Sequence, residues 1–368
     1  MFERELMLTH RQEEHDRLHH EFLTSTDGAT RKRLIQEHDA IVGPDHWSYM
    51  CYARTHSPLP SPYFGSQGRY IEPLLKLLVH RHPDMHAISD ATSGSNAPMY
   101  LAKRMGLRVR TNDWCHMSYF VSRAVVVANH EPPNMVSIDP ERVVPVPGFV
   151  KSLELFPYDV ATYIDGVATL ALAHDDPLTL AALAGTLVSG YTYRGMCYDK
   201  NWCREATLVV FHNRLLKRRG LLQAAILRDQ PEGEAFNLDA EDFVSLPGEH
   251  DTLYMDFAWP WTTGAPVDTY DFFSRDISSV LLQKPLEKHQ FTTKEDIVPK
   301  ILAIWKKALG HYNRLILSTQ STNYPPGDQL EEVLLSEFGP RCKYHTFYDV
   351  VSSVNSKPFR ELVYVVER

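Results

Sequence analysis

The chain has 368 residues, of which 43% are hydrophobic and 23% charged, and its formal net charge is -8. This length exceeds that of a typical domain and the composition is not that of a disordered protein, so we expect a globular α/β protein with more than one part. The acidic balance argues against indiscriminate coating of nucleic acid, although a local basic groove is compatible with it.

The lack of visible targeting signals and the spacing of the cysteines further limit the class of protein that we expect. No apolar run reaches the roughly 18 residues of a membrane helix, and the first residues lack the basic and apolar segments of a secretion signal, which predicts a cytoplasmic protein with no membrane partner. The five cysteines are scattered and form no C-x-x-C pair. They predict reduced thiols, without a disulfide framework or a zinc site.

Residues 1–45 have a polar, helical pattern, which predicts an N-terminal helical extension. His15 and His19 are four residues apart and could face one metal ion, but no carboxylate-rich motif accompanies them. We therefore expect a solvated helix and no metal. Basic clusters such as Lys103-Arg104 are likewise expected on solvated helix faces.

An opening βαβ unit is predicted between residues 86 and 113. A strand over 86–90 leads into a small-residue turn that contains Gly94 and Ser95, then into a helix over 99–105. A second strand over 107–111 ends at an acid, Asp113, 19 residues beyond Gly94. Small residues let the backbone approach a ligand at the helix N-terminus, and an acid at this spacing is where ribose hydroxyls are held.

The ligand expected at this turn is a nucleoside with an amino-acid tail. The turn is not G-x-G-x-x-G and has no P-loop lysine, so a pyrophosphate or triphosphate does not suit it. S-adenosylmethionine is such a molecule. Its adenine needs an acid and an apolar wall, which the segment 239–243 could supply.

More than a hundred residues separate Asp113 from Asp239, and they mix aromatic with basic side chains. Basic groups bind phosphates while aromatic rings stack on bases, so the mixture suits nucleic acid. A helical subdomain that packs its own tyrosines explains it equally well. The apolar run over 160–188 is expected to form the core of that part.

The segment 251–261 predicts a short buried strand that ends at Asp256 and runs into a turn of aromatic residues and prolines. An acid beside a flat ring at a sheet edge has the layout of a site for a planar, amine-bearing group. The alternative is a strand end whose aspartate caps the next element and whose rings belong to the core.

Five motifs, in this order, resemble those of the Dam-like, alpha-class adenine-specific DNA methyltransferases. The first is the N-terminal cofactor motif, the second the D-x-F-x-G-x-G turn, the third an N-D pair, the fourth the D-F that brackets the cofactor adenine, and the fifth D-P-P-Y. The residues at the positions of these motifs are, in the same order, Tyr63, Gly65 and Ser66; Asp90, Thr92, Gly94, Ser95 and Asn96; Asn112 and Asp113; Asp242 and Phe243; and Asp256, Phe257, Ala258 and Trp259.

Three of the motifs carry a departure from the family pattern. Asn96 replaces the second glycine of the turn, Gln67-Gly68-Arg69 stands at the lysine of the first motif, and Phe257-Ala258 replaces both prolines of D-P-P-Y. Proline fixes φ and pre-sets a turn, so the loss of both changes how the last motif is held.

The resemblance implies an α/β fold, a Rossmann-like S-adenosylmethionine-dependent methyltransferase core with a helical insertion. It divides the chain into the extension over 1–45, core over 46–125, an inserted target-recognition module over 126–235, and core over 236–368. It implies transfer of the sulfonium methyl group to the exocyclic amine of adenine in DNA, ahead of RNA. Asp256 would accept a hydrogen bond from the amine, Ala258 would lend its carbonyl, and Trp259 would stack on the flipped base.

The nucleic-acid contacts expected in the insertion are basic: Arg194, Lys200, Arg204, Arg214, Lys217 and Arg218. Because the prolines are missing, a second hypothesis stays open. It is a catalytically degenerate relative that binds cofactor or DNA, with protein partners, inside a restriction or defence assembly.

Overall fold

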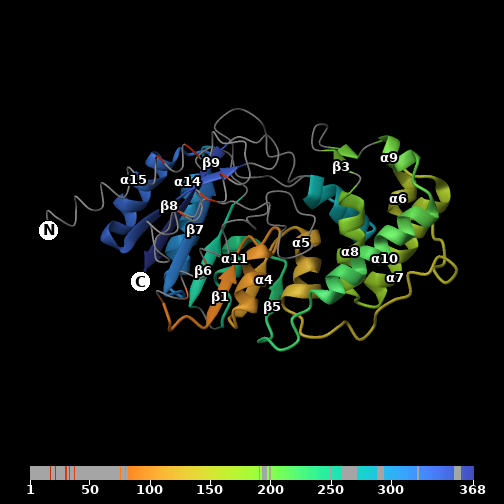
Figure 1. Cartoon of the computed structure of the whole chain (residues 1–368), viewed down its shortest axis with the longest axis horizontal. Helices are drawn as coiled ribbons and strands as arrows, with labels where there is room; N and C mark the ends of the chain where they lie inside the picture. Colours follow the sequence, from red (N-terminus) through yellow and green to blue (C-terminus); the bar gives the residue numbers. More distant parts are fainter. Residues whose placement is uncertain are drawn as a thin grey trace.

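A mixed sheet is the central element of the chain in the computed structural model (Figure 1). The described residues give it seven strands in the order β5-β2-β1-β6-β7-β9-β8. The strands are β1 (Ala87–Asp90), β2 (Arg108–Asn112), β5 (Glu234–Phe236), β6 (Thr252–Met255), β7 (Arg314–Gln320), β8 (Cys342–Val351) and β9 (Pro358–Glu367). An α/β architecture is therefore confirmed.

The structure describes residues 82–189, 191–192, 197–198, 200–248, 251–257, 272–287, 294–320, 323–351 and 358–368, with isolated positions at 17, 21, 30, 33, 37, 75 and 79. Several predicted site residues lie outside this part of the chain: Tyr63, Gly65, Ser66, Arg194, Ala258 and Trp259. Most of the predicted N-terminal extension lies outside it too.

Strands β5, β2, β1, β6 and β7 are parallel, whereas β9 runs antiparallel between β7 and β8. The register brings Asp90, at the end of β1, opposite Thr111 on one side and Tyr254 on the other. Asp113 and Asp256 each follow two residues beyond those partners. The carboxyl ends of three neighbouring strands therefore deliver three acids to one edge of the sheet.

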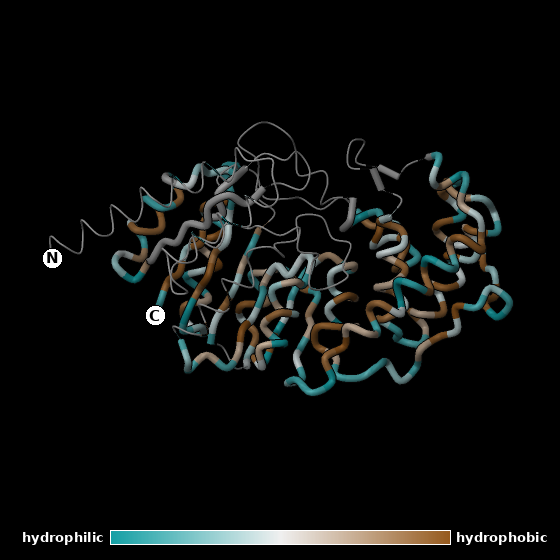
Figure 2. Tube along the Cα trace, viewed as in Figure 1, coloured by the Kyte–Doolittle hydropathy of each residue, from teal (hydrophilic) through white to brown (hydrophobic). Residues whose placement is uncertain are grey.

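Side chains of the sheet alternate between two apolar cores, which makes the fold three-layered. Leu253 and Met255 of β6 belong to the core that includes Trp305, whereas Tyr254 belongs to the core on the opposite face. Figure 2 shows the apolar residues that run along the strands and through the helices on the right of the view. Both faces of the sheet are covered, as parallel strands require.

The helices that cover the two faces come from different parts of the chain. On the Tyr254 face, α4 (Ala97–Arg104) contacts β1 and β2, and the π-helix η1 (Ser122–Val126) contacts β5. The same apolar core continues beside the sheet through α5 (His116–Val121), α7 (Tyr158–Ala173), α8 (Pro177–Val188), α10 (Leu208–Ala224) and α13 (Ser278–Leu282) (Figure 1). The other face carries α11 (Ala240–Phe243), α14 (Ile297–Ala308) and α15 (Gly327–Phe338). Shorter elements are α6 (Phe149–Ser152), α9 (Lys200–Arg204), the π-helix η2 (Phe272–Ile277), the 3-10 helix η3 (Gly339–Arg341) and the hairpin strands β3 (Tyr191–Thr192) and β4 (Cys197–Tyr198).

The helices between β2 and β5 form the right-hand part of Figure 1, and α7, α8 and α10 pack against one another there. The side chains of α8 are all buried, and most of those of α7 are too, so the apolar run over 160–188 is core, as predicted. Two fully buried acids fix the loops around these helices. Asp165 accepts hydrogen bonds from the backbone N–H groups of Gly148, Val150 and Lys151 at 2.8–2.9 Å.

The N-terminus of α8 is capped by the second of these acids, Asp176. Its carboxylate accepts hydrogen bonds from the backbone N–H of Thr179 at 3.0 Å and from that of Val136 at 2.9 Å. A buried carboxylate that binds backbone N–H groups satisfies donors that would otherwise be lost inside the core. The short α7–α8 connection is thus fixed by polar contacts within an apolar bundle.

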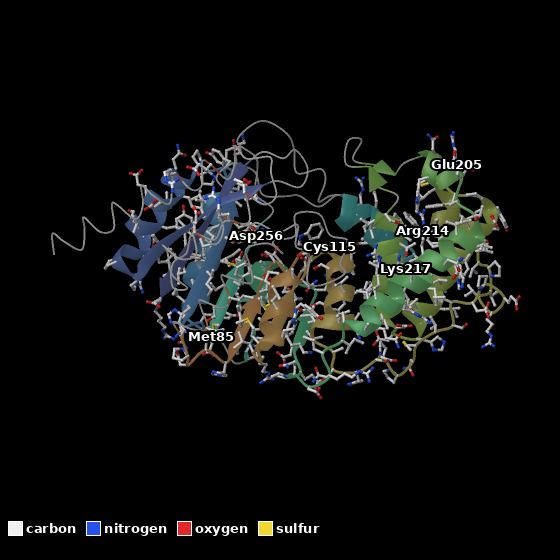
Figure 3. All side chains as sticks on the ribbon, viewed as in Figure 1. Met85, Cys115, Glu205, Arg214, Lys217 and Asp256 are labelled. Carbon is white, nitrogen blue, oxygen red and sulfur yellow. The ribbon has the colours of Figure 1, made fainter. Side chains whose placement is uncertain are left out.

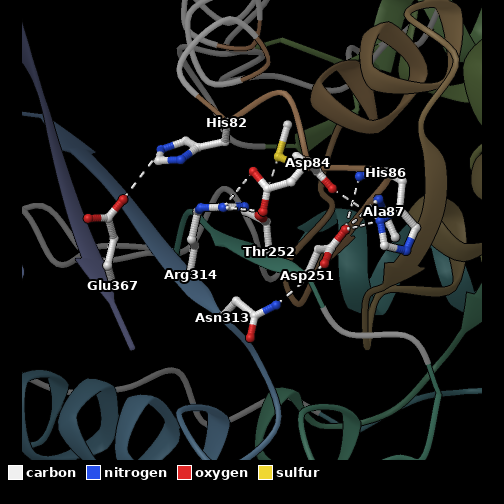
Figure 4. Close-up of polar contacts among 10 residues, drawn as sticks. His82, Asp84, His86, Ala87, Asp251, Thr252, Asn313, Arg314 and Glu367 are labelled. Carbon is white, nitrogen blue, oxygen red and sulfur yellow. Dashed lines mark hydrogen bonds and ion pairs between the residues drawn. The ribbon is translucent and has the colours of Figure 1, made fainter.

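At the amino edge of the sheet, charged side chains tie the strand starts together (Figure 4). Asp251 accepts hydrogen bonds from the backbone N–H groups of His86 and Ala87 at 2.9 and 3.1 Å, and it pairs with the His86 ring at 2.8 Å. Arg314 donates from one nitrogen to both carboxylate oxygens of Asp84 at 3.0 and 2.9 Å. These contacts connect the starts of β1, β6 and β7.

The expectation of a solvated Lys103 is wrong, because this side chain is completely buried. Its ammonium group donates to the carbonyls of Val127 and Ala128 at 3.0 and 2.8 Å and to the amide oxygen of Asn129 at 2.6 Å. Burial lowers the pKa of Lys103 to about 8. The lysine therefore joins α4 to the segment that follows η1.

None of the helices in the described ranges combines the length and the apolar character that crossing a bilayer would take.

Candidate active site

Three acids, Asp90, Asp113 and Asp256, follow β1, β2 and β6 at the carboxyl edge, and we call them the carboxyl-edge acids. In Figure 3, Asp256 and Cys115 lie toward this edge, whereas Met85 lies at the opposite edge. The sequence predicted that residues far apart in the chain would meet here, and the parallel register brings them together. Among the described residues, no group of three or more His, Cys, Asp or Glu is arranged to hold a metal ion.

The turn after β1 has two left-handed residues, Gly94 with φ 46° and Asn96 with φ 62°. Glycine adopts this conformation without strain, and asparagine is among the side chains that tolerate it best. Asn96 also precedes the first turn of α4, with Pro98 inside that turn. The asparagine that departs from the family's second glycine therefore meets the same backbone requirement.

The Asn96 side chain is completely buried. Its amide nitrogen donates to the carbonyl and to the hydroxyl of Ser118 at 3.0 and 3.2 Å, which connects the turn to α5. Its amide oxygen is buried without a hydrogen-bond partner in the part of the chain that the structure describes. Such an oxygen costs free energy and is common near functional sites.

Asp113 is bound to the same turn. One carboxylate oxygen accepts the N–H of Gly94 at 2.6 Å, and the other accepts the N–H of Cys115 at 2.8 Å. Burial raises the pKa of Asp113 to about 6, although the hydrogen bonds from Cys115, Gly94 and Ser118 act in the opposite direction. The predicted pair of Gly94 and Asp113 is thus in direct contact, and the acid shapes the turn that precedes α4.

Asn112 joins the turn after β1 to the turn after β5. Its side-chain nitrogen donates to the carbonyls of Ala91 and Leu238 at 3.0 and 3.1 Å, and its oxygen accepts the N–H of Leu238 at 3.0 Å. The sequence singled out Asn112 only through the N-D resemblance. The structure gives a physical reason for an amide here, because one side chain satisfies both donors and acceptors of two turns.

Asp90 lies at the centre of this edge and is 1% exposed. Its carboxylate accepts the N–H of Thr92 at 2.9 Å. Burial raises the pKa of Asp90 well above its ordinary value, and the nearby charges of Asp113 and Asp256 raise it further, while the bond from Thr92 lowers it. The carboxyl-edge acids therefore repel one another electrostatically, and a cation bound among them would relieve that repulsion.

Asp256 is half-buried, and its backbone N–H donates to the hydroxyl of Thr92 at 2.9 Å. The next residue, Phe257, is partly buried against the core that contains Leu253 and Met255. Of the four residues predicted at the catalytic turn, the structure describes these two. Asp256 stands at the carboxyl edge beside the turn after β1, and Phe257 points into apolar packing.

Phe243 has no exposed surface. Its ring lies 5.5 Å from that of Phe236, and the guanidinium of Arg110 lies over both rings, 5.2 Å from Phe236 and 5.5 Å from Phe243. Asp242 is exposed on α11. The predicted role of Phe243 as an apolar wall for adenine is not supported by this burial, because the ring already packs on both sides.

Two other residues at the carboxyl edge fit better: Asp239, which begins the segment 239–243 expected at the adenine, and Trp114, which the sequence analysis did not single out. Asp239 comes three residues after the end of β5 and caps α11, with its side chain 47% exposed. Trp114 directly follows Asp113 and is half-buried. A signal existed for both, since the residues that follow a parallel strand line this edge. A ligand at this edge could therefore contact the exposed acid Asp239 after β5 and the half-buried ring of Trp114 after β2.

Five of the six predicted nucleic-acid residues lie on α9 and α10, and the sixth, Arg194, lies outside the described residues. Arg204, Arg214 and Lys217 are exposed, whereas Arg218 is half-buried and burial lowers its pKa. The Arg214 guanidinium lies over the ring of Trp202 at 5.5 Å. Lys200 lies in the first turn of α9. Arg214 and Lys217 are labelled on α10 in Figure 3. Among residues 200–228, Glu205 is the single acid beside seven lysines and arginines.

Comparison with known proteins adds no assignment, since no protein-family model matches the chain and no curated protein matches it significantly.

Proposed function

We propose that the chain is an S-adenosylmethionine-dependent methyltransferase that acts on the exocyclic amine of adenine in DNA. The observation that carries the proposal is the group of carboxyl-edge acids, Asp90, Asp113 and Asp256, beside the small-residue turn. S-adenosylmethionine bears a sulfonium and an ammonium cation. A site rich in buried carboxylates favours such a ligand over an anionic nucleotide.

The sheet order supports the same proposal. The five parallel strands of the sheet, with β9 antiparallel between β7 and β8, are compatible with a Rossmann-like core of the kind that the resemblance implies. Fold alone does not establish function, so the argument depends on the site. The two agree, because the acids stand where parallel strands end and ligands of such sheets bind.

The residues at the edge suit each part of the cofactor. Asp113 would accept the ribose hydroxyls with the lone pairs that Gly94 and Cys115 leave unused. Asp239 would accept the adenine amine, and Trp114 would pack against the adenine ring. The turn at Gly94 would lie against the amino-acid tail. The cofactor supplies an electrophilic methyl group when it is bound.

Asp256 would act on the target base. The lone pair of the adenine amine is delocalised into the ring, so the amine is a poor nucleophile until an acceptor binds its hydrogens. With Asp256 as that acceptor, the amine nitrogen forms the new bond to carbon while the sulfur–carbon bond breaks. The displaced N–H proton leaves to solvent. The chain needs no covalent intermediate for this reaction.

The basic surface of α9 and α10 supplies the contact with DNA in this proposal. Its lysines and arginines are concentrated in a chain of net charge -8, so they give one part of the molecule a positive field. Phosphate contacts position a duplex but carry no sequence information. Arg204, Arg214 and Lys217 are therefore proposed as positioning contacts.

The test uses purified protein with methyl-labelled S-adenosylmethionine and mixed genomic DNA, followed by identification of the labelled base. We expect label in N6-methyladenine. Asp256→Ala should reduce transfer at least a hundredfold, a loss comparable to removing one transition-state hydrogen bond. Its affinity for the cofactor should stay within about threefold of the original, because the acid touches the target and not the cofactor. Asp159→Ala, an exposed acid on α7, is the control.

A second function is favoured by the absence of both prolines at Phe257 and Ala258. In that case the chain binds cofactor or DNA without transferring the methyl group, as a degenerate member of a restriction or defence assembly. Cofactor binding with no label in DNA or RNA would support this second function. Absence of cofactor binding would contradict both.

A further inference from the structure

The turn after β1 and the turn after β6 are joined by one side-chain hydrogen bond. The hydroxyl of Thr92 accepts the backbone N–H of Asp256 at 2.9 Å, although the two residues are 164 positions apart. This contact fixes the backbone at the residue that directly follows β6. It connects the turn proposed to approach the cofactor with the acid proposed to act on the base.

Thr92 is itself firmly anchored. Its backbone N–H donates to the buried carboxylate of Asp90 at 2.9 Å. The preceding residue, Ala91, donates its N–H to the carbonyl of Tyr254 at 3.2 Å, so the turn continues alongside β6. The backbone that carries the acceptor hydroxyl is therefore held by the buried Asp90 carboxylate and by the hydrogen bond from Ala91 to Tyr254.

The contact lies at two departures from the family pattern, Thr92 itself and the pair Phe257-Ala258 that follows Asp256. The D-x-F-x-G-x-G motif has phenylalanine at the position of Thr92, and a phenyl ring cannot accept a hydrogen bond from a backbone N–H in this way. The D-P-P-Y motif has prolines at the positions of Phe257 and Ala258. Proline restricts φ and so fixes a turn by covalent geometry.

We propose that Thr92 is a positioning residue that holds the Asp256 turn in place of the missing prolines. Phe257 assists from the other side, since it is partly buried against the core that contains Leu253 and Met255. A hydrogen bond and an apolar anchor thus replace two fixed φ angles. The catalytic meaning of this role rests on the proposed function, whereas the hydrogen bond itself can be tested without it.

The contact also links the two halves of the site. Because Thr92 belongs to the turn beside Gly94, a ligand that immobilises this turn also steadies the acceptor of the Asp256 N–H. Binding of S-adenosylmethionine is then expected to slow amide exchange at Asp256. Coupling of this kind is reciprocal, so a target bound at Asp256 should tighten cofactor binding.

The variants are chosen so that only the hydroxyl changes. Thr92→Val keeps the branched shape of a half-buried side chain and removes the acceptor, while Thr92→Ser keeps the acceptor. Thr162→Val is the matched control, because that hydroxyl donates only to the carbonyls of Tyr158 and Asp159 within its own helix. Each variant is examined as the full chain.

The first readout is hydrogen–deuterium exchange of the peptide that covers residues 251–257. Loss of one hydrogen bond should speed exchange at the Asp256 amide about fivefold in Thr92→Val. Thr92→Ser and Thr162→Val should exchange at the original rate, as should the β7 segment 314–320 in every variant. Unchanged exchange at residues 251–257 in Thr92→Val would overturn the proposal, whatever the activity of the protein.

The second readout is transfer from labelled S-adenosylmethionine. Thr92→Val should lower kcat about fivefold to tenfold with KM for the cofactor changed less than twofold, and Thr92→Ser should recover most of kcat. If the original chain transfers label and Thr92→Val transfers it equally fast, the positioning role is wrong although the proposed function stands. If the original chain transfers none, the proposed function fails and the exchange result alone decides on Thr92.

Discussion

The two edges of the sheet hold their acids in different ways. At the amino edge, Asp84 meets the guanidinium of Arg314, and this hydrogen bond lowers the pKa of Asp84 below its ordinary value. At the carboxyl edge, Asp90 and Asp113 bind backbone N–H groups, and burial raises the pKa of both. One edge stabilises the charged form of an acid and the other opposes it.

This difference between the two edges indicates which edge stabilises the fold and which edge is expected to bind a ligand. A charge paired with a cation lowers the free energy of the folded chain, and the Asp84 pair contributes stability that is lost only as acid protonates the carboxylate below its usual range. Buried acids with raised pKa values cost stability until a cation or a proton arrives. The amino edge therefore aligns the strands, and the carboxyl edge is the edge at which we propose that the ligand binds.

The largest stability effect is expected from Asp251→Ala at the amino edge. The substitution leaves the buried N–H of Ala87 and the partly buried N–H of His86 without their acceptor, and an unsatisfied buried group costs about 1–3 kcal/mol. We expect the free energy of unfolding to fall by about 2–4 kcal/mol. Urea unfolding measures it, with the exposed acid Glu141→Ala as control. A loss equal to that of the control would refute the structural assignment of this edge.

At the carboxyl edge, the pKa of Asp113 gives a dependence on pH. The folded pKa of about 6 lies above the ordinary value of 3.8, so ionised Asp113 destabilises the folded chain. This destabilisation grows as pH rises from 3.8 to about 6. The ionised form is the one that accepts ribose hydroxyls in the proposed site. Cofactor affinity should therefore fall as pH drops below about 6, by roughly tenfold per unit, which is about 1.4 kcal/mol.

Titration calorimetry with S-adenosylmethionine between pH 5 and pH 8 checks this dependence. Asp113→Asn should flatten the profile, provided that circular dichroism shows a folded chain, because the amide cannot ionise. An affinity that stays constant down to about pH 5 in the original protein would show that the cofactor does not use the Asp113 carboxylate.

The smallest effect concerns the left-handed Asn96. Asn96→Gly removes the hydrogen bonds to Ser118 but suits φ 62°, so we expect a loss of about 1 kcal/mol in the free energy of unfolding. Asn96→Ala adds the cost of a Cβ in this conformation, about 1 kcal/mol more. Thermal unfolding of the two variants side by side tests the order. Alanine as stable as glycine would mean that the backbone there relaxes.

Local patterns predicted the strands and the turn of the site well. Alternating and apolar runs predicted β1, β2 and β6 within one or two residues, and the small residues around Gly94 predicted the turn. Both signals depend on neighbours in sequence. The spacing from Gly94 to Asp113 predicted an acid for ribose hydroxyls, and in the structure this acid accepts the N–H of Gly94, a contact that the spacing did not predict.

Tertiary packing determines which side chains are buried and which contact one another, and the local sequence patterns did not predict this. Phe243 was expected at a ligand but is enclosed by Phe236 and Arg110, and Lys103 was expected in solvent but is buried and donates to three oxygen acceptors. A side chain on a short helix faces either way until its neighbours are known, and a buried lysine depends on carbonyls more than twenty residues away. The contact between Thr92 and Asp256, 164 residues apart, had no local signal at all.

The most direct measurement compares Asp251→Ala with Asp256→Ala, because these acids flank the same strand, β6. Methyl transfer from labelled S-adenosylmethionine and urea unfolding are recorded for both. We predict that Asp256→Ala loses at least a hundredfold in transfer and less than about 1 kcal/mol in unfolding free energy. Asp251→Ala should lose stability while its folded fraction keeps transferring. Equal losses of both quantities in the two variants would contradict the division between a structural and a binding edge.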